Sequence, residues 1–90
     1  MAWRIEFERA AERELESLPE QSVRRILRFL HERVGPLDNP RSLGEALKGN
    51  RLGHLWKYRV GDYWIIAAIE DQNLRILVVR VGDRRDVYRR

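Results

Sequence analysis

One short hairpin carries side chains that could bind a nucleic acid. In residues 59–69 (RVGDYWIIAAI), two hydrophobic runs flank Gly61–Asp62, which is typical of a two-residue type II′ turn. Such a turn pairs Arg59 with Trp64 across the two strands and places Lys57 on the same face. An indole and a guanidinium can stack on unpaired bases while cations bind phosphate. Alternatively, Arg59 and Trp64 only shield each other, through a cation–π contact worth roughly 0.5–1 kcal/mol.

Positive charge is concentrated in the second half of the chain. The 90 residues include 18 Lys/Arg and 14 Asp/Glu, which gives a formal net charge of +4. Residues 1–45 contain 8 Arg against 9 Asp/Glu, and residues 46–90 contain 10 Lys/Arg against 5, so the halves carry −1 and +5. This asymmetry indicates an anionic partner for the second half, and nucleic acid is one such partner. An ordinary basic surface would give the same totals.

Composition excludes several kinds of site. The chain is long enough for one small domain. It has no cysteine, which rules out disulfides, zinc–thiolate sites and thiol nucleophiles. Its two histidines are too few for a metal site, and we expect no metal and no cofactor. No apolar run approaches the roughly 20 residues that span a bilayer, and no leader pattern opens the chain, so a cytoplasmic protein without a membrane partner is expected.

Hydrophobic patterning predicts a strand, two helices and a group of strands. Alternation with period two predicts a strand over residues 2–7, and helical spacing follows over 8–16. A capping box is expected at Ser17–Glu20, and it would open a second helix that runs to about Val34. The exposed arginines of that helix are interpreted as a solvated face. The other expected elements are a helical turn within 45–50 (EALKGN), strands at about 54–60, 63–70 and 74–81, and a turn at 70–73.

This order predicts a single α+β domain over residues 1–90. An N-terminal strand and a two-helix hairpin precede a three-stranded antiparallel meander, and all strands join one sheet with the helices on one face. Strand parity then sorts the side chains. The face toward the helices is expected to hold Trp56, Tyr58, Ile65, Ala67 and Ile69. The open face is expected to hold Lys57, Arg59, Trp64 and Ile66, and it is left for solvent or for a partner.

Two motifs in the second half resemble a known family. The stretch LKGNRLGHLWKYRVGDYWII and the closing ILVVRVGDRRDVYRR resemble the RelE/ParE toxin superfamily, and its RelE branch in particular. The order of elements, the length and the motif spacing also agree, so the resemblance covers nearly the whole chain. It implies a RelE-like fold and a toxin of a type II toxin–antitoxin pair.

The resemblance further implies an activity and partners. RelE-type toxins enter the ribosomal A site and cut the mRNA there, with the 2′-hydroxyl as nucleophile and without a metal ion. The implied partners are a RelB-like antitoxin, mRNA and the ribosomal A site, together with operator DNA through the antitoxin complex alone.

Site residues are also implied by the resemblance. Lys57 and Arg59 match the basic pair on the first meander strand, and Arg84 matches the arginine found shortly after "VG". Tyr88 matches a terminal tyrosine that stacks on a base or aids proton transfer. These four residues are expected to be catalytic. The expected RNA-binding residues are Trp64, Arg85 and Lys48.

Two positions depart from the family pattern. Trp64 stands where the family commonly has an arginine that binds the scissile phosphate, and Asp83 stands where close relatives often have histidine. Indole cannot replace the missing charge, and losing one such donor costs on the order of 10²–10³ in rate. A weakened nuclease is therefore expected. Trp64 is equally consistent with a divergent target, or with a detoxifying change acquired during cloning.

Two other functions remain compatible with the sequence. A ParE-like inhibitor of DNA gyrase would keep the fold without needing the basic nuclease residues. A non-catalytic module would act mainly by binding its antitoxin in operator repression, and the open apolar side chains expected for that contact are Leu55, Ile66 and their neighbours.

Overall fold

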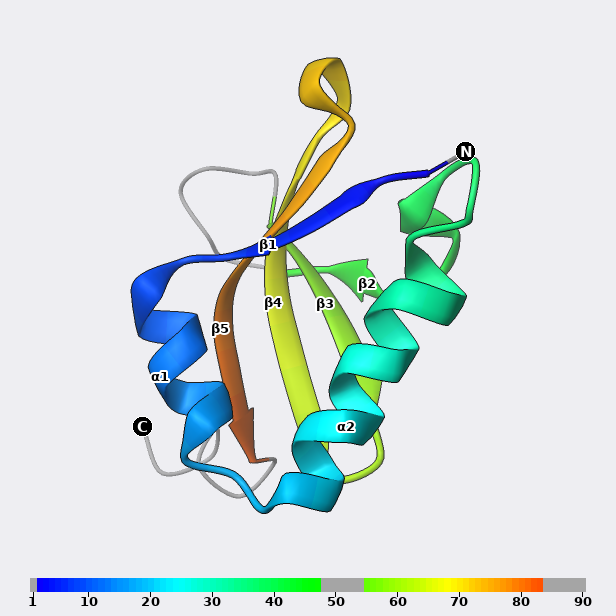
Figure 1. Cartoon of the computed structure of the whole chain (residues 1–90). Coiled ribbons are helices and arrows are strands. Elements are labelled where there is room, and N and C mark those ends of the chain that lie inside the picture. The colour runs from blue at the N-terminus through cyan, green and yellow to red at the C-terminus, as the bar shows by residue number, and fades with distance from the viewer. Residues whose placement is uncertain (1, 48–54, 84–90) are drawn as a thin grey trace.

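The described residues form one five-stranded sheet covered on one side by helices (Figure 1). The computed structural model describes residues 2–47 and 55–83. Strand order is β1-β5-β4-β3-β2, with β1 parallel to β5 and all other pairs antiparallel. The strands are β1 (Arg4–Phe7), β2 (Glu45–Ala46), β3 (Leu55–Val60), β4 (Tyr63–Glu70) and β5 (Arg75–Asp83). The helices are α1 (Arg9–Glu16) and α2 (Glu20–Arg28), which continues as a π-helical turn over Phe29–Val34; short 3-10 turns occupy Pro40–Ser42 and Asp71–Asn73.

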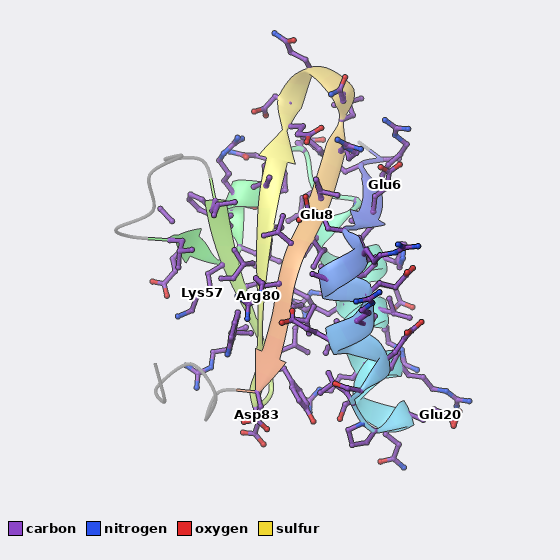
Figure 2. The ribbon with its side chains drawn as sticks, turned by 90° about the vertical axis from the view of Figure 1, so that its left-hand side faces the viewer. Glu6, Glu8, Glu20, Lys57, Arg80 and Asp83 are labelled. Atoms are coloured by element: carbon purple, nitrogen blue, oxygen red, sulfur yellow. The ribbon has the colours of Figure 1, made fainter. Side chains whose placement is uncertain are left out.

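The core lies between the sheet and the two helices. Ile26, Leu30 and Val34 are fully buried on α2 and its extension, where apolar residues recur at helical spacing. Tyr58, Ile65 and other alternate strand residues are buried opposite them, including Ala67, Ile69, Ile76, Val78 and Val81. Figure 2 shows the helices on one side of the sheet and Lys57 pointing away from them. The predicted α+β class, with helices on one face, is confirmed.

The β3–β4 hairpin has the register that the sequence predicts. Val60 pairs with Tyr63, Arg59 with Trp64, and Lys57 with Ile66. The turn depends on Gly61, whose φ of 59° lies in the left-handed region that glycine adopts most readily. Two adjacent cationic positions of β3 are thereby fixed on the open face.

Three local predictions are wrong. Ser17 does not cap the second helix, because its hydroxyl donates back to the Glu14 carbonyl at 2.7 Å and α2 begins after Pro19 without a side-chain cap. Glu45–Ala46 forms the edge strand β2 in place of a helical turn, since pairing with β3 satisfies its backbone, and this adds a fifth strand. Ile66 is only 6% exposed although it lies on the open face, because long side chains flank it on β3 and β5.

A bulge in β5 changes the register in the middle of the sheet. Ala67 pairs with Val78 but Ile66 pairs with Arg80, so Val79 is an extra residue on β5. Without it, simple alternation would turn Arg80 toward the helices and Val81 toward the open face. With it, Val81 is buried and Arg80 joins the row of Lys57 and Ile66.

Within residues 2–47 and 55–83, no helix has the length and apolar character required to cross a membrane.

Candidate nucleic-acid interface

Two cations stand side by side on the open face of β3. Lys57 and Arg59 are two residues apart, so their side chains project from the same face of the strand. Arg59 is exposed and Lys57 is partly exposed. Neither side chain makes a hydrogen bond or an ion pair within the described part of the chain. The pair therefore offers two positive charges to an anionic ligand.

One acidic position lies directly opposite Lys57, on β2. Glu45 lies opposite Lys57 in the register, yet the two form no ion pair shorter than 4.0 Å among the described residues. Because Glu45 is exposed, its carboxylate remains hydrated and neutralises Lys57 only weakly.

Trp64 is anchored within the sheet. Its indole Nε1 donates to the Asp83 carbonyl at 2.9 Å. Its ring lies over Gly82, the residue that pairs with it on β5: a Cβ atom at Gly82 would be 2.7 Å from Trp64 Cζ2. Arg59 pairs with Trp64 on the other side. Trp64 thus links β4 to the end of β5, and its partly exposed ring remains beside the cationic pair.

Arg80 is a basic residue of this face that the sequence patterns did not select. Its guanidinium Nε donates to Glu14 Oε2 at 3.0 Å, and Glu14 Oε1 accepts from the Val81 N–H at 2.8 Å. The side chain of Arg80 is 42% exposed. The alternation of buried and open residues along β5 is interrupted at Val79. The sequence would therefore have indicated Arg80 only if it carried a signal for the bulge. Figure 2 shows Arg80 and Lys57 at the same level of the sheet.

The positive surface continues around the β3–β4 turn onto α2. A shallow groove of about 490 Å³ is lined by Arg59 and Gly61, by the helix residues Arg25, Arg28 and Arg33, and by one acidic residue, Glu32. These helix arginines were interpreted as a solvated face, but three of them border the same groove as Arg59. An extended anion could contact the sheet face and α2 together.

The buried tyrosine near this face has a structural role. Tyr58 is fully buried, and its hydroxyl donates to the Pro40 carbonyl at 2.7 Å. Burial raises the pKa of Tyr58 to about 12, which the nearby charge of Arg41 only partly opposes. At neutral pH the hydroxyl is protonated and enclosed, so it does not take part in proton transfer on the open face.

Four of the expected site residues lie outside the described residues. The structure brings together Lys57, Arg59 and Trp64 on one face. It says nothing of Lys48, Arg84, Arg85 and Tyr88, whose assignments remain predictions. The described part of the chain contains no group of three or more side chains that could hold a metal ion.

The chain matches a known toxin family over most of its length. Residues 5–88 match the family described as the ParE toxin of the type II toxin–antitoxin system parDE. Toxin RelE of Mycobacterium tuberculosis is 36% identical over 80 residues, which cover 88% of this chain and 78% of that protein. Toxin RelG of the same organism is 29% identical over 91 residues and matches along the full length of both chains.

Comparison with solved structures supports the same fold. The toxin–antitoxin complex RelBE2 from Mycobacterium tuberculosis contains a chain that matches with a TM-score of 0.82. The match covers 93% of each chain at 23% sequence identity. At that identity the likeness concerns the fold, and it agrees with the helix and strand order described above.

Proposed function

The chain belongs to the RelE/ParE family of toxins from type II toxin–antitoxin systems, and from this premise we propose that it is a ribosome-dependent mRNA endoribonuclease. The relatives named RelE and RelG support the RelE branch, since one of them exceeds 30% identity over most of this chain. The proposal assigns cleavage to the open face of the sheet.

The observation that carries this proposal is the unpaired state of Lys57 and Arg59. Tyr58 and Val60 point to the other face of β3 and are needed there as core residues. Core packing does not require the two cations on the open face, which have no acidic partner in the described structure. Two such cations suit a phosphodiester, whose negative charge increases in the transition state. The arginine-lined groove beside Arg59 extends this positive surface for the rest of an RNA chain.

The proposed reaction is attack by the 2′-hydroxyl on the adjacent phosphorus. The 2′-oxygen loses its proton and forms a bond to phosphorus, and the bond from phosphorus to the 5′-oxygen breaks after that oxygen gains a proton. The products are a 2′,3′-cyclic phosphate and a 5′-hydroxyl end. Lys57 and Arg59 would stabilise the charge on the pentacovalent phosphorus, while Arg84 and Tyr88 are proposed to complete phosphate binding and proton transfer. The nucleophile belongs to the RNA, so we propose that no metal ion is required.

Base contacts are proposed for the remaining assigned residues. Trp64 offers the partly exposed part of its indole to a base, while Lys48 and Arg85 are proposed to bind the RNA backbone. Because Trp64 carries no charge, we expect slow cleavage compared with a toxin that has arginine at this position.

The proposal is tested with purified protein and ribosomes programmed with a defined mRNA. We expect cleavage in the A-site codon, and we expect Lys57→Ala to slow the single-turnover step by about 10²–10³-fold because one charge on the phosphate is lost. Arg4→Ala is the matched control, since Arg4 is an exposed arginine on β1 that bonds to Asn73 and Glu6 near the β4–β5 turn, at the other end of the sheet from the β3–β4 turn. Full activity of a folded Lys57→Ala protein would contradict the site assignment.

A RelB-like antitoxin is the proposed protein partner. Several solved structures with the same fold are toxin–antitoxin complexes, including RelBE2 of Mycobacterium tuberculosis and the intact RelBE complex of Escherichia coli. We propose that operator DNA is bound only through the antitoxin complex, and that toxin and RNA meet in the cytoplasm. Co-purification of this chain with a co-expressed RelB-like antitoxin would test the first contact.

A second candidate function is inhibition of DNA gyrase, as in a ParE-like toxin. The matching family is named after the ParE toxin, and the uncharged Trp64 and acidic Asp83 would not hinder this function. A supercoiling assay separates the two proposals. Inhibited supercoiling without mRNA cleavage would favour the gyrase target, whereas codon-specific cleavage with normal supercoiling would favour the nuclease.

A further inference from the structure

We propose that Arg80 is a further phosphate-binding residue of the open face and contacts the RNA backbone through its two terminal guanidinium nitrogens. This inference rests on the proposed nuclease function and extends its binding site from β3 to β5. It concerns a residue that neither the sequence motifs nor the family resemblance selects.

The first support is position. Arg80 pairs with Ile66 across β4–β5, and Ile66 pairs with Lys57 across β3–β4. The three side chains form one row on the open face, and neighbouring strands are about 4.8 Å apart, so the two cations begin about 10 Å apart. Ile66 between them is buried, which leaves an apolar floor with a cation on either side. This spacing suits a polyanionic chain lying across the strands.

The second support is the way in which Glu14 holds Arg80. Glu14 Oε2 accepts from Arg80 Nε at 3.0 Å, while its other oxygen accepts from the Val81 N–H at 2.8 Å. The carboxylate is therefore shared between a side chain and the backbone, and it does not engage the two terminal nitrogens. A guanidinium has five N–H donors, of which this contact uses one. Glu14 acts as a positioning residue that fixes one edge of the guanidinium.

The third support is a contrast with other arginines. Arg75, on the same strand, uses Nε and Nη2 on Glu70 and Nη1 on Glu6. Arg41 uses both terminal nitrogens on Asp71. Within residues 2–47 and 55–83, the terminal nitrogens of Arg80 have no such partner, and its side chain is more exposed than those of the other two. Parallel terminal N–H groups match a phosphate in bidentate geometry.

The test measures how salt affects binding of a short single-stranded 2′-O-methyl RNA, which lacks the nucleophile and cannot be cleaved. We expect Arg80→Gln to weaken binding about tenfold and to reduce the slope of log affinity against log salt by about 0.7, the value for one phosphate contact on a single strand. Arg80→Lys keeps the charge but not the fork, so the slope should recover while the affinity recovers only in part.

The matched control is Arg75→Gln. It removes the same net charge from the same strand, but from a guanidinium whose three nitrogens each already donate to a carboxylate, so its slope should equal that of the original protein. Thermal unfolding confirms that each variant is folded. An unchanged slope in folded Arg80→Gln, or an equal loss in Arg75→Gln, would overturn the inference.

Cleavage on programmed ribosomes separates this inference from the function on which it rests. If the original chain cleaves mRNA while folded Arg80→Gln keeps the original salt slope, Arg80 only joins α1 to β5 and the nuclease proposal stands. If the original chain neither cleaves mRNA nor binds the RNA, both proposals fail.

Discussion

Among single residues, Trp64 shows that the role of a side chain in a binding motif also depends on the residues that it contacts. The sequence places an indole beside Arg59 on an open face, and both placements are confirmed. What alternation could not indicate is that the ring lies over Gly82 and that its nitrogen donates to the Asp83 carbonyl. An aromatic residue fits here because the cross-strand neighbour has no side chain. A packing role inside the sheet therefore accompanies the proposed stacking role.

Trp64→Phe should separate these two roles. The phenyl ring keeps much of the contact with Gly82 but cannot donate to Asp83, so we expect a loss of about 0.5–1.5 kcal/mol in the free energy of unfolding. Urea denaturation measures the loss. An unchanged stability would mean that the hydrogen bond to Asp83 contributes nothing to the folded state.

Trp64→Arg should increase mRNA cleavage. A guanidinium beside Arg59 would add a charged donor for the phosphate, and we expect the single-turnover rate to rise on the order of 10²-fold on programmed ribosomes. The rate of Trp64→Phe is the control for loss of the indole alone. If arginine and phenylalanine gave the same rate, the missing charge would not limit cleavage.

Among the strands, the regular alternation of covered and open side chains was predictable from the sequence, but the places where it is interrupted were not. The β3–β4 register follows from a glycine-containing turn between two hydrophobic runs, and the structure confirms it. The bulge at Val79 and the two-residue strand β2 depend on contacts with distant parts of the chain, such as Glu14 and Trp56. Arg80 was missed for this reason, because local sequence carries no signal for the switch in parity.

Gly44 supports the strand that carries Lys57, and Gly44→Ala should weaken it. Gly44 has φ of 79°, and a Cβ there would run into the Lys57 carbonyl and the Tyr58 ring. We expect a loss of at least about 1 kcal/mol in the free energy of unfolding, measured by denaturation.

Gly35→Ala is the control for this substitution. A Cβ at Gly35 would lie no closer than 3.4 Å to its neighbours, and its φ of −56° is ordinary for alanine. Equal stability losses in the two variants would contradict the special role of Gly44.

For the whole molecule, the order of elements was enough to predict that one face of the sheet is covered by helices and the other is open. Two helices ahead of a meander cover one side of a sheet, and the basic second half of the chain supplies the other side. The continuation of positive charge onto α2 was not predictable, because it requires the β3–β4 turn to lie beside Arg25, Arg28 and Arg33. The assignments of Lys48, Arg84, Arg85 and Tyr88 come from the family motifs alone.

The buried hydroxyl of Tyr58 should set part of the alkaline limit of stability. Its pKa is raised to about 12 from an ordinary 10.0, so the folded state favours the protonated form. This contribution is fully present below pH 10 and is lost as the pH rises toward 12. The melting temperature of the original protein should fall over that range more steeply than that of Tyr58→Phe. Parallel curves would show that the hydroxyl does not contribute.

Cleavage of mRNA by the open face of the sheet can be tested by mapping mRNA 5′ ends across the transcriptome after brief, controlled expression of this chain, beside a chain carrying Lys57→Ala. We expect new ends in phase with codons inside translated regions, weak for the original chain and absent for Lys57→Ala. Growth arrest by the folded original chain without any codon-phased ends would contradict this expectation and would turn attention to the gyrase target.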